Sequence, residues 1–476
     1  MTMKHSAVPL YVDLDGTLIH SDLLLESALA LLKRNPFYLF AFVFWLSRGR
    51  ASLKREIARR TEMDVSTLPW DTRIVELVHE ESKRRRVVLC TAADEELAQA
   101  VAAYVGGFHA VMASDGARNL SGNAKARALF ELHGERGFDY AGNEARDLAV
   151  WRHARAAYVA NGSASLTSRV RNICEVVMII PRQRTNLRTW LKALRLHQWL
   201  KNVLVFVPLL AGHMVLQAIP LARAMAAFVI FGMCASGVYV LNDLLDLRAD
   251  RKHPRKKMRP FATGALPLSA GLIVAPLLTA MSFVASVMLS GKFTLVLLGY
   301  YVLTLAYSLR LKQIAMLDVV VLAGLYTVRI VAGAAAISSG LSFWLLAFSM
   351  FLFLSLAILK RYTELGMQRD AGSNHAPGRS YQTSDYELLA SLGGASGYLS
   401  VLVLALYINS TASAMLYRHP QWLWLLCPLL LYWISRAWII AHRGIMRDDP
   451  VVFALTDRVS RFVLVLGTLV AVLAIR

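Results

Sequence analysis

Four side chains with oxygen donors recur at helical spacing in the C-terminal half of the chain: Asn242, Asp243, Asp246 and Asp250. At about 100° per residue they share an arc of roughly 100° on one helix face. Carboxylates on one face of a membrane helix end repel one another and are costly to desolvate. Mg²⁺ suits such oxygens and is often completed by substrate phosphates. The spacing predicts a Mg²⁺ site that substrate phosphates complete, with Asp243 and Asp246 as catalytic residues; a solvated helix end before a basic loop is the alternative.

Basic side chains that suit phosphate oxygens follow this acidic face and recur in later segments. Lys257 and Arg259 come directly after the acids, and cationic donors form strong hydrogen bonds to phosphate. Further candidates for substrate contacts are Lys201, Asn202, Lys312, Lys360 and Arg361. A lone basic residue can instead be a signal that sets membrane topology. Arg329 falls inside an expected membrane helix, where a charge is a functional candidate.

A second pair of acids lies near the N-terminus, in the run Asp13-Leu14-Asp15-Gly16-Thr17. The run follows an apolar segment that is typical of a strand, and side chains two apart on a strand point the same way. Gly16 lets the chain turn away after them. Two acids that share one strand end predict a site for nucleophilic or acid–base chemistry.

The chain that positions these residues is strongly hydrophobic and carries a net positive charge. Of its 476 residues, 56% are hydrophobic and 18% are charged, with a formal net charge of +20. So little charge excludes an ordinary soluble globular protein and a disordered chain. Residues 1–185 hold 25 Lys/Arg and 21 Asp/Glu, whereas residues 186–476 hold 27 and 11. We therefore expect a soluble domain over 1–185 and a membrane domain with basic loops over 186–476.

The first domain alternates apolar runs with helical stretches. Six runs are typical of strands, namely LYVDLD, RVVLC, HAVMAS, FDYAG, AAYVA and CEVVMII. This rhythm predicts a Rossmann-like α/β domain with a parallel sheet. Residues 23–80 interrupt it and predict a helical cap over the strand ends. Within the cap, the apolar run 36–46 is too short to span a bilayer, so we expect it in the core of the cap, with an interfacial contact as the alternative.

The second domain carries about nine hydrophobic segments of spanning length. We place them near 200–219, 222–242, 269–290, 293–311, 316–337, 342–359, 388–409, 421–441 and 460–475. Basic and nearly uncharged connections alternate between them, which predicts an all-α multi-pass membrane domain with its basic loops in the cytoplasm. The N-terminus shows no apolar signal-peptide segment, so the first domain is expected in the cytoplasm. Four widely spaced cysteines without a CxxC pair indicate neither a disulfide framework nor a zinc site.

The acidic motif carries a resemblance to a known family. The pattern N-D-x-x-D-x-x-x-D over 242–250, followed by H-P-x-x-K-x-R-P, resembles the first Asp-rich motif of the UbiA prenyltransferase superfamily. The resemblance implies a nine-helix fold and a diphosphate bound through Mg²⁺. Asp318 stands where that superfamily has a second motif, but Leu322 replaces its second acid. This departure weakens the match to enzymes that use a prenyl diphosphate.

Three further stretches resemble one branch of that superfamily, the decaprenyl-phosphate phosphoribosyltransferases. They are R-L-H-Q-W-L-K-N from residue 195, K-R-Y-x-E-L from residue 360 and A-L-x-D-R from residue 454. The resemblance implies phosphoribosyl diphosphate and a polyprenyl phosphate as substrates. It also implies that Asp318 holds ribose hydroxyls or a second metal.

The first domain resembles the haloacid dehalogenase superfamily through four motifs in chain order. They are D-x-D-G-T at Asp13, Thr91 in VVLCT, Lys125 in SGNAKARAL, and G-N-E-A-R-D ending at Asp147. The resemblance implies that Asp13 attacks a phosphoryl group, that Asp15 is the acid/base, and that Thr91 and Lys125 hold phosphoryl oxygens. It implies Mg²⁺ on Asp13, Asp147 and the Asp15 carbonyl.

One residue departs from this pattern. Asn143 stands where the superfamily has an Asp, which removes one negative charge from the metal site. The reduced charge predicts weaker metal binding. A structural or regulatory domain without activity is the alternative interpretation.

Together the motifs predict a plasma-membrane transferase that moves phosphoribosyl to a polyprenyl phosphate and releases pyrophosphate. The attached domain would then remove the 5-phosphate and leave a polyprenyl-phosphoryl ribose donor for glycan synthesis. The alternatives are an aromatic prenyltransferase of quinone or haem type and a membrane-anchored phosphatase. The expected partners are these lipid and sugar substrates, the membrane and, by resemblance, further copies of the chain. Mg²⁺ is the expected cofactor, and no nucleic acid is expected.

Overall fold

The computed structural model describes residues 8–182, 185–370, 380–446 and 449–475. It separates into two compact units. The first unit comprises Met1–Leu194 and Tyr239–Pro276, and the second comprises Arg195–Val238 and Leu277–Arg476. Residues 1–7 at the N-terminus and residues 371–379, within an expected basic loop, lie outside the described residues.

The first unit is built around a parallel six-stranded sheet in the order β3-β2-β1-β4-β5-β6. Leu10 at the start of the central strand pairs with Val87 on one side and with Asp139 on the other. All six expected strands are present, which confirms the predicted α/β class. The strands are β1 (Leu10–Val12), β2 (Val87–Asp94), β3 (Ala110–Ser114), β4 (Asp139–Gly142), β5 (Ala156–Ala160) and β6 (Glu175–Ile180).

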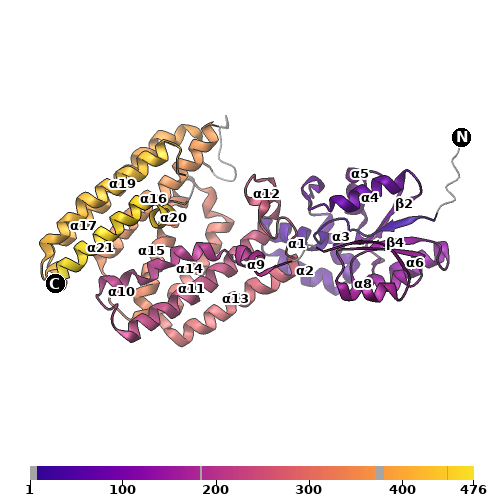
Figure 1. Cartoon of the computed structure of the whole chain (residues 1–476), viewed down its shortest axis with the longest axis horizontal. Coiled ribbons are helices and arrows are strands. Elements are labelled where there is room, and N and C mark those ends of the chain that lie inside the picture. The colour runs from indigo at the N-terminus through magenta and orange to yellow at the C-terminus, as the bar shows by residue number, and fades with distance from the viewer. Residues whose placement is uncertain (1–7, 183–184, 371–379, 447–448, 476) are drawn as a thin grey trace. The chain divides into compact units, whose positions relative to one another are not determined.

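Helices cover both faces of this sheet (Figure 1). Alternate side chains of β1 point to opposite faces: Leu10 lies in one buried cluster and Tyr11 in the other. The helices α4 (Thr72–Ser82) and α5 (Glu95–Val105) complete the first cluster. The second cluster is completed by α6 (Asn123–His133), α7 (Leu148–Trp151) and α8 (Ala164–Arg171). Because adjacent strands run in parallel, the loops after β1, β2 and β4 meet at one edge.

The expected insert over 23–80 is mostly helical. It contains α1 (Leu23–Arg34), α2 (Tyr38–Ser47), α3 (Arg50–Ala58), the short 3₁₀ turn η1 (Val65–Thr67) and most of α4. The side chain of Asp22 caps α1 by accepting a hydrogen bond from the Leu25 amide. The expectation that the apolar run 36–46 forms cap core is wrong for most of its length, because within α2 Trp45 alone is buried.

The first unit also contains the segment that carries the acidic motif. It includes the C-terminal end of α11 (Ala218–Leu245), all of α12 (Leu247–Lys252) and η4 (Lys256–Met258), and the start of α13 (Leu268–Leu289). Leu29 of α1 lies in a buried cluster with Leu244, Leu247 and Leu268. The cap therefore packs against the ends of two long apolar helices.

A buried ion pair joins the same two segments. Both Nη atoms of Arg251 donate to the Glu26 carboxylate, at 2.8 and 2.7 Å. Both side chains are almost completely buried. When either partner of a buried ion pair is removed, the charge of the other remains buried without compensation.

We expect Arg251→Ala to lower the free energy of unfolding by about 3–5 kcal/mol, because the Glu26 charge would remain buried without its partner. Thermal unfolding of the purified chain in detergent measures this as a lower midpoint. Glu56→Ala is the matched control, since Glu56 of α3 pairs with the partly exposed Arg60 and such pairs contribute about 0.5 kcal/mol. Equal shifts in the two variants would contradict the assignment.

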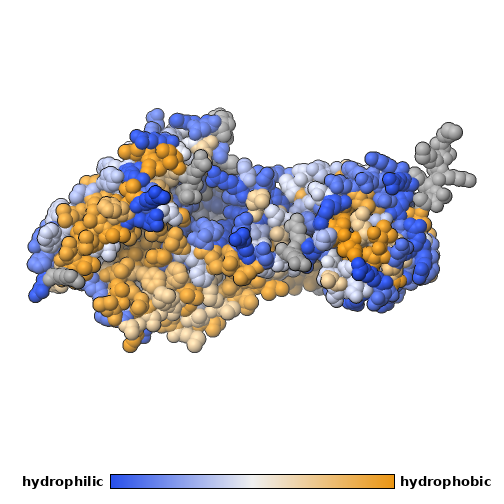
Figure 2. Space-filling model, viewed as in Figure 1, coloured by the Kyte–Doolittle hydropathy of each residue, from blue (hydrophilic) through white to orange (hydrophobic). Residues whose placement is uncertain are grey.

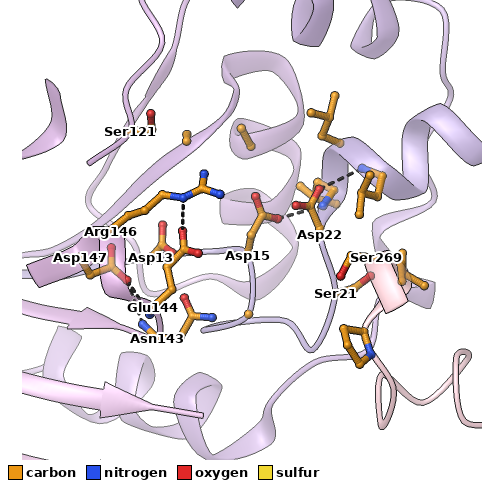
Figure 3. Close-up of a pocket in the computed structure, with 18 of the residues that line it drawn as sticks. Asp13, Asp15, Ser21, Asp22, Ser121, Asn143, Glu144, Arg146, Asp147 and Ser269 are labelled. Carbon is orange, nitrogen blue, oxygen red and sulfur yellow. Dashed lines mark hydrogen bonds and ion pairs between the residues drawn. The ribbon is translucent and has the colours of Figure 1, made fainter. Parts of the chain in front are cut away.

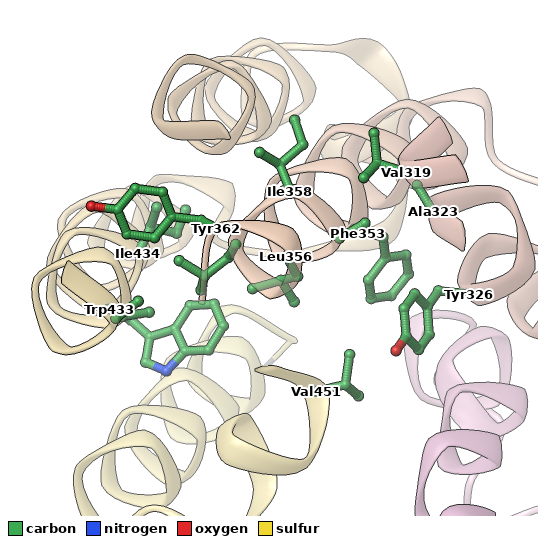
Figure 4. Packing of buried hydrophobic residues seen from close by; sticks show 14 of the residues in the cluster. Val319, Ala323, Tyr326, Phe353, Leu356, Ile358, Tyr362, Trp433, Ile434 and Val451 are labelled. Carbon is green, nitrogen blue, oxygen red and sulfur yellow. The ribbon is translucent and has the colours of Figure 1, made fainter. Parts of the chain in front are cut away.

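The second unit is a helical bundle. Its core contains side chains from α15 (Leu317–Ile337), α16 (Phe343–Asp370), α19 (Leu426–His442) and α20 (Pro450–Thr456), among them Tyr326, Phe353 and Trp433 (Figure 4). Gly333 allows close packing, since a Cβ atom there would lie 2.0 Å from the Val205 carbonyl oxygen. The helices wholly within this unit are η3 (Leu196–Phe206), α10 (Val207–Ala211), α14 (Gly291–Leu309), η5 (Leu311–Gln313), α15 (Leu317–Ile337), α16 (Phe343–Asp370), η6 (Thr383–Asp385), α17 (Tyr386–Ile408), α18 (Thr411–Leu416), η7 (Pro420–Leu425), α19 (Leu426–His442), α20 (Pro450–Thr456) and α21 (Arg458–Ile475).

Within the described residues, eight helical segments are long and apolar enough to cross a membrane. Many of their outward side chains are hydrophobic (Figure 2). The first of the nine expected segments, near 200–219, differs: it falls on the shorter apolar stretch Leu196–Ala211, and Gly212 is the C-cap that follows it. The segments of spanning length are Ala218–Leu245, Leu268–Leu289, Gly291–Leu309, Leu317–Ile337, Phe343–Asp370, Thr383–Ile408, Pro420–His442 and Arg458–Ile475.

Candidate functional site

A cavity of about 860 Å³ lies at the carboxyl ends of the central strands of the first unit (Figure 3). Asp13 and Asp15 enter it directly after β1, and Asn143 and Asp147 enter it after β4. Lys125, in the first turn of α6, also lines it. The strand order reverses between β1 and β4, and ligands of open α/β sheets bind at such a switch point.

Asp13 is held by the expected lysine. The Lys125 Nζ donates to Asp13 Oδ1 at 2.7 Å and to the Tyr140 hydroxyl oxygen at 2.8 Å. All three side chains are buried. Burial raises the pKa of Asp13, and the Lys125 ammonium opposes that rise. The Lys125 ammonium fixes the orientation of the Asp13 carboxylate, as a nucleophile requires.

Asp147 is fixed by the turn that follows β4. Its Oδ2 accepts hydrogen bonds from the amides of Asn143 at 3.0 Å and Glu144 at 3.1 Å. Its Oδ1 accepts from the Tyr140 hydroxyl at 3.0 Å. These bonds tie Asp147, Tyr140, Lys125 and Asp13 into one continuous network.

Asp15 lies in a different environment. Its Oδ1 accepts a hydrogen bond from the Leu23 amide at 2.9 Å, at the entry to the cap. Burial raises the pKa of Asp15 well above its usual range, and the carboxylate of Asp22 raises it further. Asp13 contacts the Lys125 ammonium whereas Asp15 contacts the Leu23 amide, and such different environments suit separate nucleophile and acid roles. Gly16 has φ +74°, and a Cβ atom there would lie 2.0 Å from Asn143 Nδ2, so the turn requires glycine.

Thr91 lies within β2 and is completely buried. Its Oγ1 accepts a hydrogen bond from the Ala93 amide at 3.0 Å. Asn143 Oδ1 and Asp94 Oδ2 are buried and have no hydrogen-bond donor. Both residues line the cavity, so unsatisfied oxygens are present beside the acid network.

The walls of this cavity come from three parts of the first unit. The sheet supplies the acids, the cap supplies residues such as Leu46 and Lys54, and the segment after the acidic motif supplies Pro267 and Ser269. Gly264 of that segment approaches the β1 loop closely, since a Cβ atom there would lie 2.4 Å from the His20 carbonyl oxygen. The sheet therefore contributes acids to the cavity, and the cap contributes both apolar and basic side chains.

The acidic motif, also in the first unit, surrounds a cation from its own loop. The Arg259 Nη1 lies 3.0 Å from Asp243 Oδ1 and 2.5 Å from Asp250 Oδ2. Both carboxylates are buried. Burial raises the pKa of Asp250, and Arg259 opposes the rise. Arg259 was expected to hold phosphate; in the structure it neutralises two of the predicted metal ligands.

The other residues of the motif point to different partners. Asp246 Oδ1 accepts from the Lys33 Nζ of the cap at 2.6 Å. Asn242 is half-buried on α11, and Lys257 is exposed on η4. The structure thus brings Asp243 and Asp250 together and directs Asp246 towards α1.

The donor chemistry at both acidic sites suits Mg²⁺, which prefers carboxylate and amide oxygens. Nevertheless, among the described residues no three His, Cys, Asp or Glu side chains are grouped so that they could hold a metal ion. The physical reason is visible in the contacts. Lys125, Arg259 and Lys33 each occupy a carboxylate oxygen of the expected ligands. The metal ligand sets Asp13, Asp15, Asp147 and Asn242, Asp243, Asp246, Asp250 therefore stay predictions.

In the second unit, two expected substrate residues meet on an acid that the sequence did not single out. The Nζ atoms of Lys201 and Lys360 each lie 2.8 Å from Asp449 Oδ2. The Tyr326 hydroxyl donates to Asp449 Oδ1 at 3.2 Å. Burial alone would raise the pKa of Asp449, but the two lysines hold it well below its usual range.

Two further pairs form in the same unit. The Arg329 Nε donates to Asn202 Oδ1 at 3.0 Å, and both side chains are buried. The Arg361 Nε donates to Asp318 Oδ2 at 2.6 Å. Tyr381 donates to the other oxygen of Asp318. Arg361 is thus engaged by a carboxylate within the protein, as Arg259 is.

Lys312 lies in η5 and is partly buried, one turn before α15 and Asp318. The expected transferase residues therefore form a group around Arg259 in the first unit and groups around Asp449 and Asp318 in the second.

Three residues at these sites were not predicted from the sequence. Asp449 directly precedes Pro450 and caps α20, and an acid before a proline is a helix-start signal that would have located it. Tyr140 is one residue of an apolar strand and carried no signal. Lys54 of the cap donates to the Ala92 carbonyl oxygen and to Asn119 Oδ1, but no motif spacing marks a residue in an insert.

Comparison with known proteins identifies the second half of the chain. The profile of the UbiA prenyltransferase family matches residues 205–473, more than half of the sequence. The solved structure of a UbiA homolog from Archaeoglobus fulgidus bound to GPP and Mg²⁺ covers 59% of this chain and 99% of its own, with 18% identity and a TM-score of 0.47.

Three curated relatives are similar to different parts of the chain. The uncharacterized protein y4nM of Sinorhizobium fredii is 35% identical over 469 residues, which is 98% of this chain and 90% of the relative. The nodulation protein NoeC of Azorhizobium caulinodans is 38% identical over 285 residues, 59% of this chain and 90% of the relative. The decaprenyl-phosphate phosphoribosyltransferase of Mycobacterium tuberculosis is 36% identical over 199 residues, 41% of this chain and 66% of the relative.

Proposed function

Because the chain belongs to the UbiA prenyltransferase family and is a multi-pass membrane transferase, we propose that it transfers phosphoribosyl from phosphoribosyl diphosphate to a polyprenyl phosphate. The similarity to decaprenyl-phosphate phosphoribosyltransferases supports this choice of substrates. The observation that carries it is the buried pair Asp243 and Asp250 with one cation between them. Such a pair is prepared to exchange an internal cation for a metal and its diphosphate.

The reaction is a displacement at C1 of the ribose. An oxygen of the polyprenyl phosphate forms a bond to C1 while the bond from C1 to the pyrophosphate oxygen breaks. Pyrophosphate leaves with the electron pair of that bond, so no external acid or oxidant is needed. Negative charge grows on the leaving group, and fixed cations lower the barrier by stabilising it.

Different residues of this chain would bind the metal, the phosphates and the ribose. Asn242, Asp243, Asp246 and Asp250 would hold Mg²⁺, which when bound supplies positive charge to the diphosphate. Arg259, which pairs with Asp243 and Asp250, would bind phosphate oxygens if these two carboxylates held Mg²⁺. Lys201 and Lys360, which share Asp449, would neutralise the lipid phosphate, and Lys257 and Lys312 would add basic contacts. Asp318, oriented by Arg361, would accept hydrogen bonds from ribose hydroxyls.

A second candidate function comes from the network in the first unit. We infer that this α/β domain is a phosphatase that acts on phosphate monoesters. Asp13 Oδ would attack phosphorus, and the ester oxygen would leave with a proton from Asp15. Water would then hydrolyse the aspartyl phosphate as Asp15 takes back a proton. Lys125 and Thr91 would hold phosphoryl oxygens, and Asp13, Asp147 and the Asp15 carbonyl would hold Mg²⁺.

The two activities would act in sequence. The product of the proposed transfer keeps the 5-phosphate of the ribose, which is a monoester. Its removal by the α/β domain would leave a polyprenyl-phosphoryl ribose. Positive charge in the alternate loops supports a plasma-membrane protein with this domain in the cytoplasm. An aromatic prenyltransferase remains the alternative for the membrane half, and Leu322, in place of a second acid, disfavours it.

Ligand-dependent thermal stability tests the choice of donor. With Mg²⁺ present, phosphoribosyl diphosphate is expected to raise the unfolding midpoint of the purified chain, because a ligand that binds only the native state stabilises it. The Asp243→Asn variant should lose that shift. A shift with a prenyl diphosphate and none with phosphoribosyl diphosphate would favour the aromatic prenyltransferase.

We expect Asn143→Asp to strengthen metal binding at the α/β site. The substitution restores a carboxylate beside Asp147, and the Mg²⁺ concentration for half-maximal phosphate release should fall roughly tenfold or more. Titration of Mg²⁺ against hydrolysis of p-nitrophenyl phosphate measures it. Asn119→Asp is the control, because Asn119 lines the same cavity but belongs to no expected ligand set. An unchanged requirement in Asn143→Asp would contradict a metal role for position 143.

A further inference from the structure

The cap helix α2 presents large hydrophobic side chains to solvent. Phe37 directly before it is 74% exposed, Phe40 is 72% exposed and Val43 is 69% exposed. Phe44 and Leu46 are also more than half exposed. Contiguous exposed apolar surface of this kind marks an interaction site.

The opposite side of α2 is firmly packed. Trp45 lies in a buried cluster with Leu31 and Ile57, and Tyr38 and Phe42 pack against the same cluster. The helix is therefore held in the cap through α1 and α3. Its outward residues do not contribute to that packing, so their hydrophobicity is not explained by the fold of the first unit.

The helix next to α2 indicates what lies close to this surface. Leu29 of α1 packs against Leu244 at the end of α11 and Leu268 at the start of α13. Both α11 and α13 are of membrane-spanning length and composition. Leu244 and Leu268 thus lie at the ends of two helices of membrane-spanning length, and α1 is in contact with them. The same helix α1 packs against α2, through Leu31 and Trp45.

The charged residues around α2 are also consistent with contact to a membrane surface. No charged residue occurs between Pro36 and Ser47, whereas Arg34, Arg48 and Arg50 flank the helix and are exposed. The Arg48 guanidinium lies 4.4 Å from the centre of the Phe44 ring. Arginines at both ends of the helix can bind anionic headgroups, while exposed aromatic and aliphatic side chains between them enter the boundary with the acyl chains.

We propose that α2 is an interfacial helix that docks the N-terminal domain onto an anionic lipid surface. With 10 residues it is too short to cross a bilayer, and its apolar side would enter only the boundary between headgroups and acyl chains. This inference does not depend on either proposed activity. It has a consequence for the cavity of the first unit, because Leu46, Arg50 and Leu53 line that cavity too. Docking through α2 would bring the side of the cavity that the cap forms to the headgroup layer of the membrane, where lipid-linked phosphates lie.

Site-specific photocrosslinking tests the proposal on the full chain. A benzoylphenylalanine replaces Phe40 or Phe44, two exposed positions where an added ring displaces no core residue. The protein is reconstituted into phosphatidylcholine vesicles with a minority of phosphatidylglycerol, irradiated and digested. We expect lipid adducts on the α2 peptide from both variants. The matched control places the same group at Leu132, an exposed leucine of α6, which lies at the other end of the α/β domain from α2 (Figure 1); it should form none.

The outcomes separate the possible occupants of this surface. Adducts to a second copy of the chain, seen as a crosslinked dimer, would overturn the proposal in favour of self-association. No adduct at either position of α2 would overturn it as well, as would equal lipid adducts at Leu132. Loss of the adducts when phosphatidylglycerol is omitted would support the part played by the flanking arginines.

Discussion

Replacing Asp13 by Asn is expected to abolish phosphate release by the α/β domain, with a loss on the order of 10⁴-fold or more, because the step that forms the covalent intermediate loses its nucleophile. Asn keeps the size of the side chain and its hydrogen bond to Lys125, so the cavity should persist. Release of inorganic phosphate from p-nitrophenyl phosphate by the purified chain measures the effect.

Two controls separate chemistry from folding in this experiment. Glu135→Gln changes an exposed acid of the same domain and should leave phosphate release unaltered. The Asp13→Asn protein should also keep transfer of phosphoribosyl to lipid, because that site uses none of the residues around Asp13. Full phosphate release by Asp13→Asn would contradict the phosphatase assignment.

Asp243→Asn is expected to reduce lipid transfer by about 10²–10³-fold, the usual cost of removing one group that stabilises charge in the transition state. Asp243 is buried and shares the Arg259 guanidinium with Asp250. Removing its charge weakens the attraction for any cation that replaces Arg259. Label transferred from phosphoribosyl diphosphate into organic solvent measures the loss.

The matched control for Asp243→Asn is Asp64→Asn. Asp64 also pairs with a basic residue, Lys252, but at the surface of the same unit. Its replacement should leave transfer unchanged, and both variants should keep phosphate release. Equal loss of transfer in the two variants would show a general effect on stability instead of a role for Asp243 at the site.

The α/β domain could be predicted closely from the sequence because its signals are local. Each strand is a short apolar run such as AAYVA, which became β5, and the acids follow strands whose ends must meet in a parallel sheet. The contact between Lys125 and Asp13 joins residues far apart in the chain; the motifs identify both residues as site candidates but do not predict their contact. The hydroxyl of Tyr140, which links that pair to Asp147, could not be anticipated since a tyrosine in a strand is more often core.

The membrane half was harder to predict at the level of side chains. Helix-face geometry predicts Asp243, Asp246 and Asp250 on one side of a single helix, whereas in the structure α11 ends at Leu245 and α12 begins at Leu247. The geometry also says nothing of the loop that brings Arg259 to Asp243 and Asp250. Nor could the shared contact of Lys201 and Lys360 with Asp449 be predicted, because it depends on how three separate helical segments pack.

In the cap, hydrophobicity alone gave a wrong prediction of burial for residues 36–46. The run over 36–46 has the composition of a buried helix, and composition cannot distinguish protein core from a lipid-facing surface. In the structure only one side of α2 is packed. The distinction came from the exposed fraction of Phe40 and its neighbours, which depends on where α1 and α3 lie.

The most direct test of the central claim is transfer of label by the purified chain in lipid vesicles. Phosphoribosyl diphosphate labelled in the ribose is incubated with a polyprenyl phosphate and Mg²⁺, and the organic phase is counted. Label should enter the lipid with release of one pyrophosphate per ribose, and Asp243→Asn should prevent it. If no label enters the lipid at any Mg²⁺ concentration, while a labelled prenyl diphosphate is consumed with an aromatic acceptor, the proposed transfer is wrong.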